Sequence, residues 1–87
     1  MDYFVYILRC GDGTLYIGVT NDLSRRLAAH RAGKGAKYTR GRSPLELVYH
    51  ETCPDKPTAL RREWALKQLS RGQKLDIIRT ADIKTGP

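Results

Sequence analysis

The sequence predicts an α/β protein of the α+β kind, with elements in the order β-β-α-β-α-α. Three observations lead to this prediction. The chain opens on an apolar and aromatic run, Tyr3–Arg9, and a glycine-rich turn separates it from a second run, Leu15–Thr20. Three stretches with helical spacing then surround a third short strand. Since 87 residues suit one core, we expect a domain over residues 1–80 and a flexible tail over 81–87.

The first two strands are expected to pair as a hairpin. The first run is too short for a helix and is typical of a strand covered on both faces. If paired residue numbers sum to an even value, four residues share one face: Tyr6, Leu8, Tyr16 and Gly18. We favour this register, because an odd sum would separate the two tyrosines.

A helix follows the second strand directly. Asn21 or Asp22 is a natural N-cap, and the helix is predicted to run to about Ala32, with Gly33 as the residue that ends it. The strand and the helix are thus joined with almost no loop.

The first helix carries two polar side chains beside its apolar stripe. At 100° per residue, Leu23 and Leu27 define the expected buried stripe. Arg26 and His30 lie on one flank of it, one turn apart, and Arg25 points to the opposite side. We therefore expect Arg26 and His30 next to the core, near the sheet edge.

Positive charge is concentrated in the middle of the chain. The formal net charge is +7, and no Asp or Glu occurs from Leu23 to Leu45. Gly33 to Ser43 has no hydrophobic period and is predicted to be a basic, mobile loop. A one-sided positive field favours a nucleic-acid partner over a merely solubilising face or membrane lipid. The candidate nucleic-acid-binding residues are Arg25, Lys34, Lys37, Tyr38, Arg40 and Arg42.

The second half of the chain contains one strand and two helices. The strand is expected over Leu45 to His50, with a connection over Glu51 to Asp55. Pro57 suits the first turn of a helix that runs to about Leu69. A capping box, Ser70 with Gln73, opens a last helix that is expected to end near position 79.

The second helix is expected to place one carboxylate on its apolar face, where burial of the charge costs free energy. The expected apolar face comprises Ala59, Leu60, Trp64, Leu66 and Leu69, and Glu63 falls inside it. Such a carboxylate must be paired or must bind a cation. The sequence leaves two interpretations of Glu63 open: an ion pair with Lys67, one turn later, or a metal-binding role.

The cysteines and the N-terminus suggest a cytoplasmic protein. Cys10 and Cys53 lie far apart without zinc-ligand spacing, so we expect free thiols. The start of the chain has neither the basic segment nor the long apolar stretch of a signal or membrane anchor.

Five residues together suit phosphodiester hydrolysis. Taken singly, Tyr6 and Tyr16 are ordinary strand aromatics, Arg26 is an ordinary helix cation, and His30 is an ordinary edge histidine. Combined with Glu63, they offer a base for water, a cation for the developing charge and a carboxylate for a divalent metal.

These residues give the chain a resemblance to the GIY-YIG nuclease domain superfamily. The sequence shows Val5-Tyr6-Ile7, then Tyr16-Ile17-Gly18, then Arg26, His30 and Glu63 at the family's spacings. It is most similar to the small stand-alone bacterial members, which also have counterparts of 35–40 and 60–63. The first motif lacks the family's glycine, since Val5 occupies that place.

The resemblance implies a fold, an activity and a set of roles. The fold would be the GIY-YIG endonuclease fold, a small three-stranded sheet flanked by helices. The activity would be hydrolysis of DNA with Mg²⁺ or Mn²⁺ and no small-molecule cofactor. Tyr16 would be the general base, Arg26 would stabilise phosphate charge, Glu63 would ligate the metal, and Tyr6 and His30 would support the site.

Three functions compete at this point. The first is a metal-dependent, structure- or damage-directed DNA endonuclease linked to repair or recombination. The second is a module that grips DNA or RNA through the same basic surface without cutting. The third is an interaction subunit of a repair complex, for which the sequence offers no obvious apolar patch. We favour the endonuclease, because binding alone has no use for Glu63 on an apolar helix face.

Overall fold

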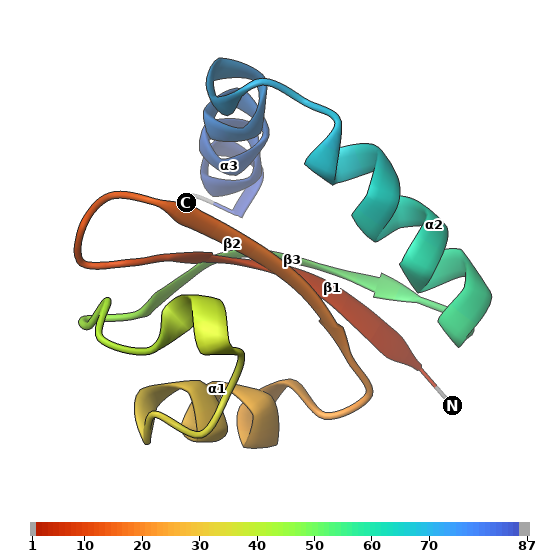
Figure 1. Ribbon diagram of the computed structural model, residues 1–87. Coiled ribbons are helices and arrows are strands. Elements are labelled where there is room, and N and C mark those ends of the chain that lie inside the picture. Colours follow the sequence, from red (N-terminus) through yellow and green to blue (C-terminus); the bar gives the residue numbers. More distant parts are fainter. Residues whose placement is uncertain (1, 86–87) are drawn as a thin grey trace.

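The protein folds around a three-stranded antiparallel sheet, as the sequence predicts. A computed structural model describes residues 2–85, with side chains for 2–81. The strands are β1 (Tyr3–Arg9), β2 (Leu15–Thr20) and β3 (Glu46–Cys53), in the spatial order β2-β1-β3. Helix α1 (Leu23–Arg31) covers one face, and α2 (Lys56–Lys67) and α3 (Arg71–Thr85) cover the other (Figure 1). The α+β class and the element order are confirmed.

The hairpin pairs in the expected register. Tyr6 lies opposite Gly18 and Leu8 lies opposite Tyr16, so the residue numbers sum to an even value. Both tyrosines therefore face α1, while Val5, Ile7 and Ile17 face the other helices. Each face of the sheet is covered by its own layer of helices. A slip of one residue in the strand pairing would therefore move every side chain of the slipped strand to the opposite face.

Two of the predicted boundaries are wrong. β3 continues to Cys53, where the sequence predicts a connection, because β1 pairs with it over its whole length and Tyr3 lies opposite Cys53. α3 runs past position 79 to Thr85 and so includes much of the predicted tail. Positions 86 and 87 lie outside the described residues.

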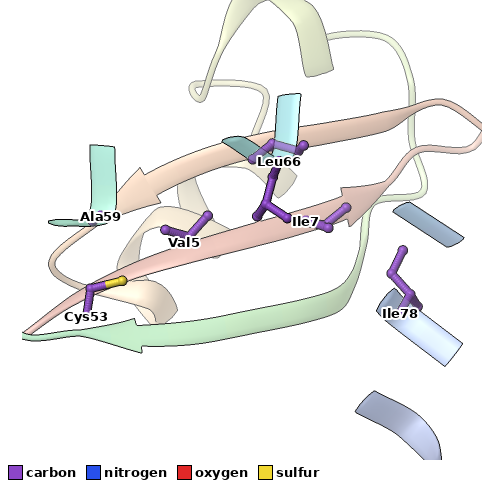
Figure 2. Close-up of a cluster of buried hydrophobic side chains, with 7 residues drawn as sticks. Val5, Ile7, Cys53, Ala59, Leu66 and Ile78 are labelled. Atoms are coloured by element: carbon purple, nitrogen blue, oxygen red, sulfur yellow. The ribbon is translucent and has the colours of Figure 1, made fainter. Parts of the chain in front are cut away.

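The apolar core lies between the sheet and helices α2 and α3 (Figure 2). Its buried members are Val5, Ile7, Ile17, Cys53, Ala59, Leu66 and Ile78. The valine that replaces the family's glycine is fully buried here, where its side chain fills core volume. This face of the sheet supplies packing.

Helix α2 does not present the face that its apolar pattern suggests. Leu60 and Trp64 are 44% and 67% exposed, whereas Ala59 and Leu66 are fully buried. A polar contact between distant segments accompanies this orientation, since Arg62 Nε donates to Glu51 Oε1 of β3 over 2.8 Å. The hydroxyl of Tyr49 donates to the same carboxylate. α2 is thus rotated so that Glu63 lies half-buried at the flank.

Helix α1 has the predicted ends but not the predicted buried stripe. Asp22 is the N-cap and accepts from the backbone N–H of Arg25. Gly33 follows the helix with a φ of 74°, a conformation that glycine adopts without strain. The one buried residue of α1 is His30, and Leu23 and Leu27 are only half-buried. The imidazole is buried because both of its ring nitrogens are hydrogen-bonded.

The basic loop has defined structure. A 3₁₀ turn, η1 (Lys37–Thr39), forms inside it, and Thr39 is 2% exposed. A buried hydrogen bond between His30 and Thr39 ties this part of the predicted mobile loop to α1. Within residues 2–85, no helix is both long and apolar enough to cross a membrane.

Candidate active site

Two tyrosines lie side by side on the α1 face of the hairpin. The ring centroids of Tyr6 and Tyr16 are 6.3 Å apart. Gly18, opposite Tyr6, makes this arrangement possible. A Cβ on Gly18 would lie 2.5 Å from the Tyr6 hydroxyl and 3.1 Å from the Tyr16 ring. The glycine of the second motif is therefore required by the ring that lies across it.

The Tyr6 hydroxyl begins a buried chain of hydrogen bonds. It lies 2.9 Å from His30 Nε2, and His30 Nδ1 lies 2.9 Å from the hydroxyl of Thr39. Thr39 in turn donates to the carbonyl oxygen of Ala36. The chain thus runs from the sheet through α1 to the backbone of the loop.

The backbone end of this chain determines the direction of every bond in it. Thr39 has one hydroxyl hydrogen, which goes to Ala36, so its oxygen must accept from His30 Nδ1–H. A neutral imidazole protonated at Nδ1 has an acceptor at Nε2, so Tyr6 must donate there. Burial first, and the nearby charge of Arg26 second, lower the pKa of His30, which favours this neutral form. The Tyr6 oxygen keeps its lone pairs for another donor.

Arg26 lines the same pocket as both tyrosines. The Tyr6 hydroxyl is the largest influence on the pKa of Arg26, which is raised, and Tyr16 acts in the same direction. Burial raises the pKa of Tyr6, although Arg26 opposes this shift. Tyr6 is therefore a hydrogen-bonded support, and the guanidinium is available to an anion next to Tyr16.

These groups open onto a pocket of about 500 Å³ at the β2 edge of the sheet. Tyr6, Tyr16 and Arg26 line one side of it, and Lys56, Leu60 and Glu63 of α2 line the other. Glu63 also forms an ion pair with Lys67 over 3.4 Å, so the pairing left open by the sequence does occur. The pocket brings together a phenol, a guanidinium and a carboxylate from three elements.

A divalent metal fits this pocket only with ligands from outside the chain. Among the described residues, no three His, Cys, Asp or Glu side chains gather at one point. Of the side chains that the structure describes, Glu63 is the one carboxylate that lines the pocket. Mg²⁺ is commonly bound by one or two carboxylates together with water and substrate phosphate oxygens. Glu63 therefore suits Mg²⁺ when a substrate phosphodiester supplies further oxygen ligands.

The candidate nucleic-acid-binding residues fall into two groups. Arg25, Lys34, Lys37 and Arg40 are exposed and present their charge to solvent. Arg42 instead forms an ion pair with Asp12, and its guanidinium lies 4.5 Å from the centre of the Tyr38 ring.

Tyr38 connects the loop to the site. Its ring stacks on Tyr16, with the centroids 5.8 Å apart. Tyr16 is thus backed by Tyr38 and, behind it, by the guanidinium of Arg42.

Thr39 and Gly35 are absent from the residues that the sequence singles out for the site. Gly35 packs against His30, and a Cβ there would lie 2.3 Å from Nδ1. Both occur in the 35–40 stretch that the small bacterial members share, but neither has a side-chain type that suggests chemistry. Their role depends on packing against His30, which a one-dimensional pattern does not contain.

The fold and the site together define a small α+β domain with a tyrosine, arginine and glutamate pocket at the edge of a hairpin. Comparison with known proteins gives the family. The model of the GIY-YIG catalytic domain matches residues 2–76, so the chain belongs to the GIY-YIG family. This places it among nucleases, which implies a nucleic-acid substrate, and such nucleases generally depend on a divalent metal.

Similar proteins are found in several organisms. A UPF0213 protein of Lactiplantibacillus plantarum is 56% identical over 94% of this chain and 83% of its own length. One from Halobacterium salinarum is 54% identical over 83% of this chain and 94% of its own length.

Solved structures of similar proteins share the fold. The solution structure of a UPF0213 protein from Bacillus halodurans has a TM-score of 0.60 at 47% identity and covers 100% of this chain and 89% of its own. A protein from E. faecalis has a TM-score of 0.66 at 34% identity and covers 100% of this chain and 93% of its own.

Proposed function

We propose that this protein is a divalent-metal-dependent DNA endonuclease that acts on branched or damaged DNA, with a role in repair or recombination. The observation that carries the proposal is the pocket that Tyr16, Arg26 and Glu63 line together. Each group comes from a different element, and the three provide what hydrolysis of a phosphodiester needs. The pocket lies at an edge of the sheet, which suits a DNA strand that bends away from its partner strand or is separated from it.

In the proposed reaction, Tyr16 takes a proton from the attacking water. The water oxygen forms a bond to phosphorus while the bond from phosphorus to the leaving sugar oxygen breaks, and that oxygen is protonated by solvent. Arg26, which lines the same pocket, stabilises the negative charge of the phosphate, and Tyr16 accepts the proton in its phenolate form.

Tyr6, His30 and Thr39 hold this arrangement in place. The Tyr6 hydrogen is donated to His30, which leaves the Tyr6 oxygen free to accept from Arg26. The guanidinium is thereby oriented before substrate arrives, which is the condition for efficient electrostatic stabilisation. Mg²⁺ or Mn²⁺ held by Glu63 and substrate oxygens would add Lewis-acid stabilisation of the same charge.

One observation favours a different function. Glu63 is already satisfied by Lys67, so the carboxylate needs no metal to be stable where it lies. A module that binds DNA or RNA without cutting would keep the same exposed cations. We retain it as the second candidate.

The two candidates are separated by a cleavage assay. Purified protein is titrated with Mg²⁺ or Mn²⁺ in the presence of labelled single-stranded, duplex, flapped and branched DNA. The proposal expects metal-dependent cutting that is lost in Glu63→Ala, while Lys67→Ala, which removes only the ion-pair partner, keeps or increases it. Binding without cutting, equal in wild type and Glu63→Ala, would support the second candidate and overturn the first.

A further inference from the structure

A second pocket is bordered by Tyr38, the residue whose ring stacks on Tyr16. It measures about 180 Å³ and is lined by Thr14, Leu15, Tyr38, Arg71 and Lys74. The two cations come from the first turn of α3, far in sequence from the basic loop. Neither is among the residues that the sequence singles out for nucleic-acid binding.

The cations of this pocket are available to a ligand. Neither Arg71 nor Lys74 forms an ion pair with the part of the chain that the structure describes. The nearby carboxylate of the β1–β2 turn, Asp12, is engaged by Arg42 instead. Arg71 reaches toward that turn, with Nη2 4.0 Å from where a Cβ on Gly13 would lie. Among the residues that the structure describes, the pocket therefore combines two positive charges with no lining carboxylate.

Tyr38 joins this pocket to the candidate active site. It lines the second pocket and stacks on Tyr16, which lines the first. Tyr16 and Gly18 border the first pocket and Leu15 borders the second, so the two pockets lie within roughly 10 Å of each other along β2. This distance suits phosphates a short way apart on one strand.

We propose that Arg71 and Lys74 form a second phosphate subsite, which holds the substrate strand a few nucleotides from the phosphate at Tyr16. The strand would follow the exposed edge of β2 and pass along Tyr38, a residue that is 45% exposed. The inference rests on the proposed function for its ligand, a nucleic-acid strand. Beyond the proposed function, the subsite specifies the direction in which the strand runs from the active site.

The test measures binding, so that it does not depend on cleavage. Glu63→Gln protein is titrated with fluorescent single-stranded DNA of increasing length at several salt concentrations. The test variant adds Arg71→Ala and Lys74→Ala. The control adds Arg61→Ala and Arg79→Ala, which remove the same charge but do not line either pocket. All four positions except the half-buried Lys74 are exposed, and thermal melting verifies the fold of each variant.

The subsite predicts a loss that depends on oligonucleotide length. For longer strands, the test variant should bind about tenfold more weakly, and its salt slope should be lower by about 1 to 2. For the shortest strands, which cannot reach from one pocket to the other, test and control should be equal. Equal affinities and slopes for test and control at every length would overturn the subsite.

The same variants distinguish this inference from the proposed function. If wild-type protein cuts DNA and the test variant binds like the control, the subsite fails while the nuclease stands. If no protein cuts DNA but the length-dependent loss appears, the subsite stands and the catalytic proposal fails.

Discussion

The two faces of the hairpin are built from alternate residues of the same strands, yet they are held together differently. On one face, Val5, Ile7 and Ile17 pack against α2 and α3 through apolar contacts. On the other, Tyr6 is equally buried but is surrounded by hydrogen-bonding groups. Apolar packing tolerates changes of similar volume, whereas a buried polar chain fails when any one of its members is lost. We therefore expect substitutions on the first face to change stability and those on the second to change chemistry.

The largest effect is expected from Gly18→Ala. The new methyl group would collide with the Tyr6 hydroxyl and approach the Tyr16 ring, so both tyrosines must move. We expect cleavage to fall by at least about 100-fold, with a loss of about 1 to 3 kcal/mol in the free energy of unfolding. Gly72→Ala in α3 is the control, because a Cβ there has its nearest neighbour at 3.9 Å. Cleavage at the wild-type rate by Gly18→Ala would mean that the tyrosine positions do not matter.

A smaller effect is expected from Thr39→Val, which keeps the side-chain shape but removes the hydroxyl. His30 would lose the acceptor that fixes its tautomer, and Tyr6 would lose its defined donor direction. We expect cleavage to fall by roughly tenfold, in the range of a single lost orienting hydrogen bond.

Thr39→Ser is the matched control, since it keeps the hydroxyl and should restore most of the rate. The ¹⁵N chemical shifts of the His30 ring nitrogens give a second measurement. The Nδ1–H tautomer should dominate in Thr39→Ser and not in Thr39→Val. Equal rates for Ser and Val would exclude a positioning role for Thr39.

The smallest effect is on the pH dependence of stability. The pKa of His30 is lowered in the folded protein, so below its ordinary value of about 6.5 the unfolded chain takes up a proton that the folded protein resists. The free energy of unfolding should therefore decrease as pH falls from about 6.5. Asp12 and Asp55, whose pKa values are lowered, add their own loss only near and below pH 4.

This pH dependence is measured by urea unfolding between pH 7 and pH 5. His30→Gln should flatten the profile, and His50→Gln, at the exposed histidine of β3, should not. An unchanged profile in His30→Gln would show that this imidazole does not resist protonation in the fold.

The hairpin was the most predictable part of the molecule. Its strands, its register and the shared face of Tyr6 and Tyr16 follow from a two-residue period and a short turn, which are local properties. The N-cap Asp22 and the C-terminal Gly33 of α1 are equally local.

The parts that could not be predicted depend on contacts between distant segments. The apolar pattern of α2 suggests a buried Trp64, but the ion pair from Arg62 to Glu51 accompanies a different orientation. The stripe of α1 suggests buried leucines, but hydrogen bonds to Tyr6 and Thr39 make His30 the buried residue. Neither pairing leaves a periodic signal in the sequence.

The central claim is that the hairpin's own side chains serve chemistry on the α1 face and packing on the other face, with α2 adding Glu63 at the sheet edge. Tyr16→Phe and Tyr49→Phe test it most directly, because each removes a single hydroxyl, on opposite faces. Tyr49 packs against the apolar core and donates to Glu51.

Cleavage rate and free energy of unfolding are to be measured for both variants. We predict that Tyr16→Phe loses at least about 100-fold in rate with its stability nearly unchanged. Tyr49→Phe should cut at the wild-type rate and lose about 1 kcal/mol of stability. If Tyr16→Phe cuts as fast as wild type, or if both variants lose rate equally, the account is contradicted.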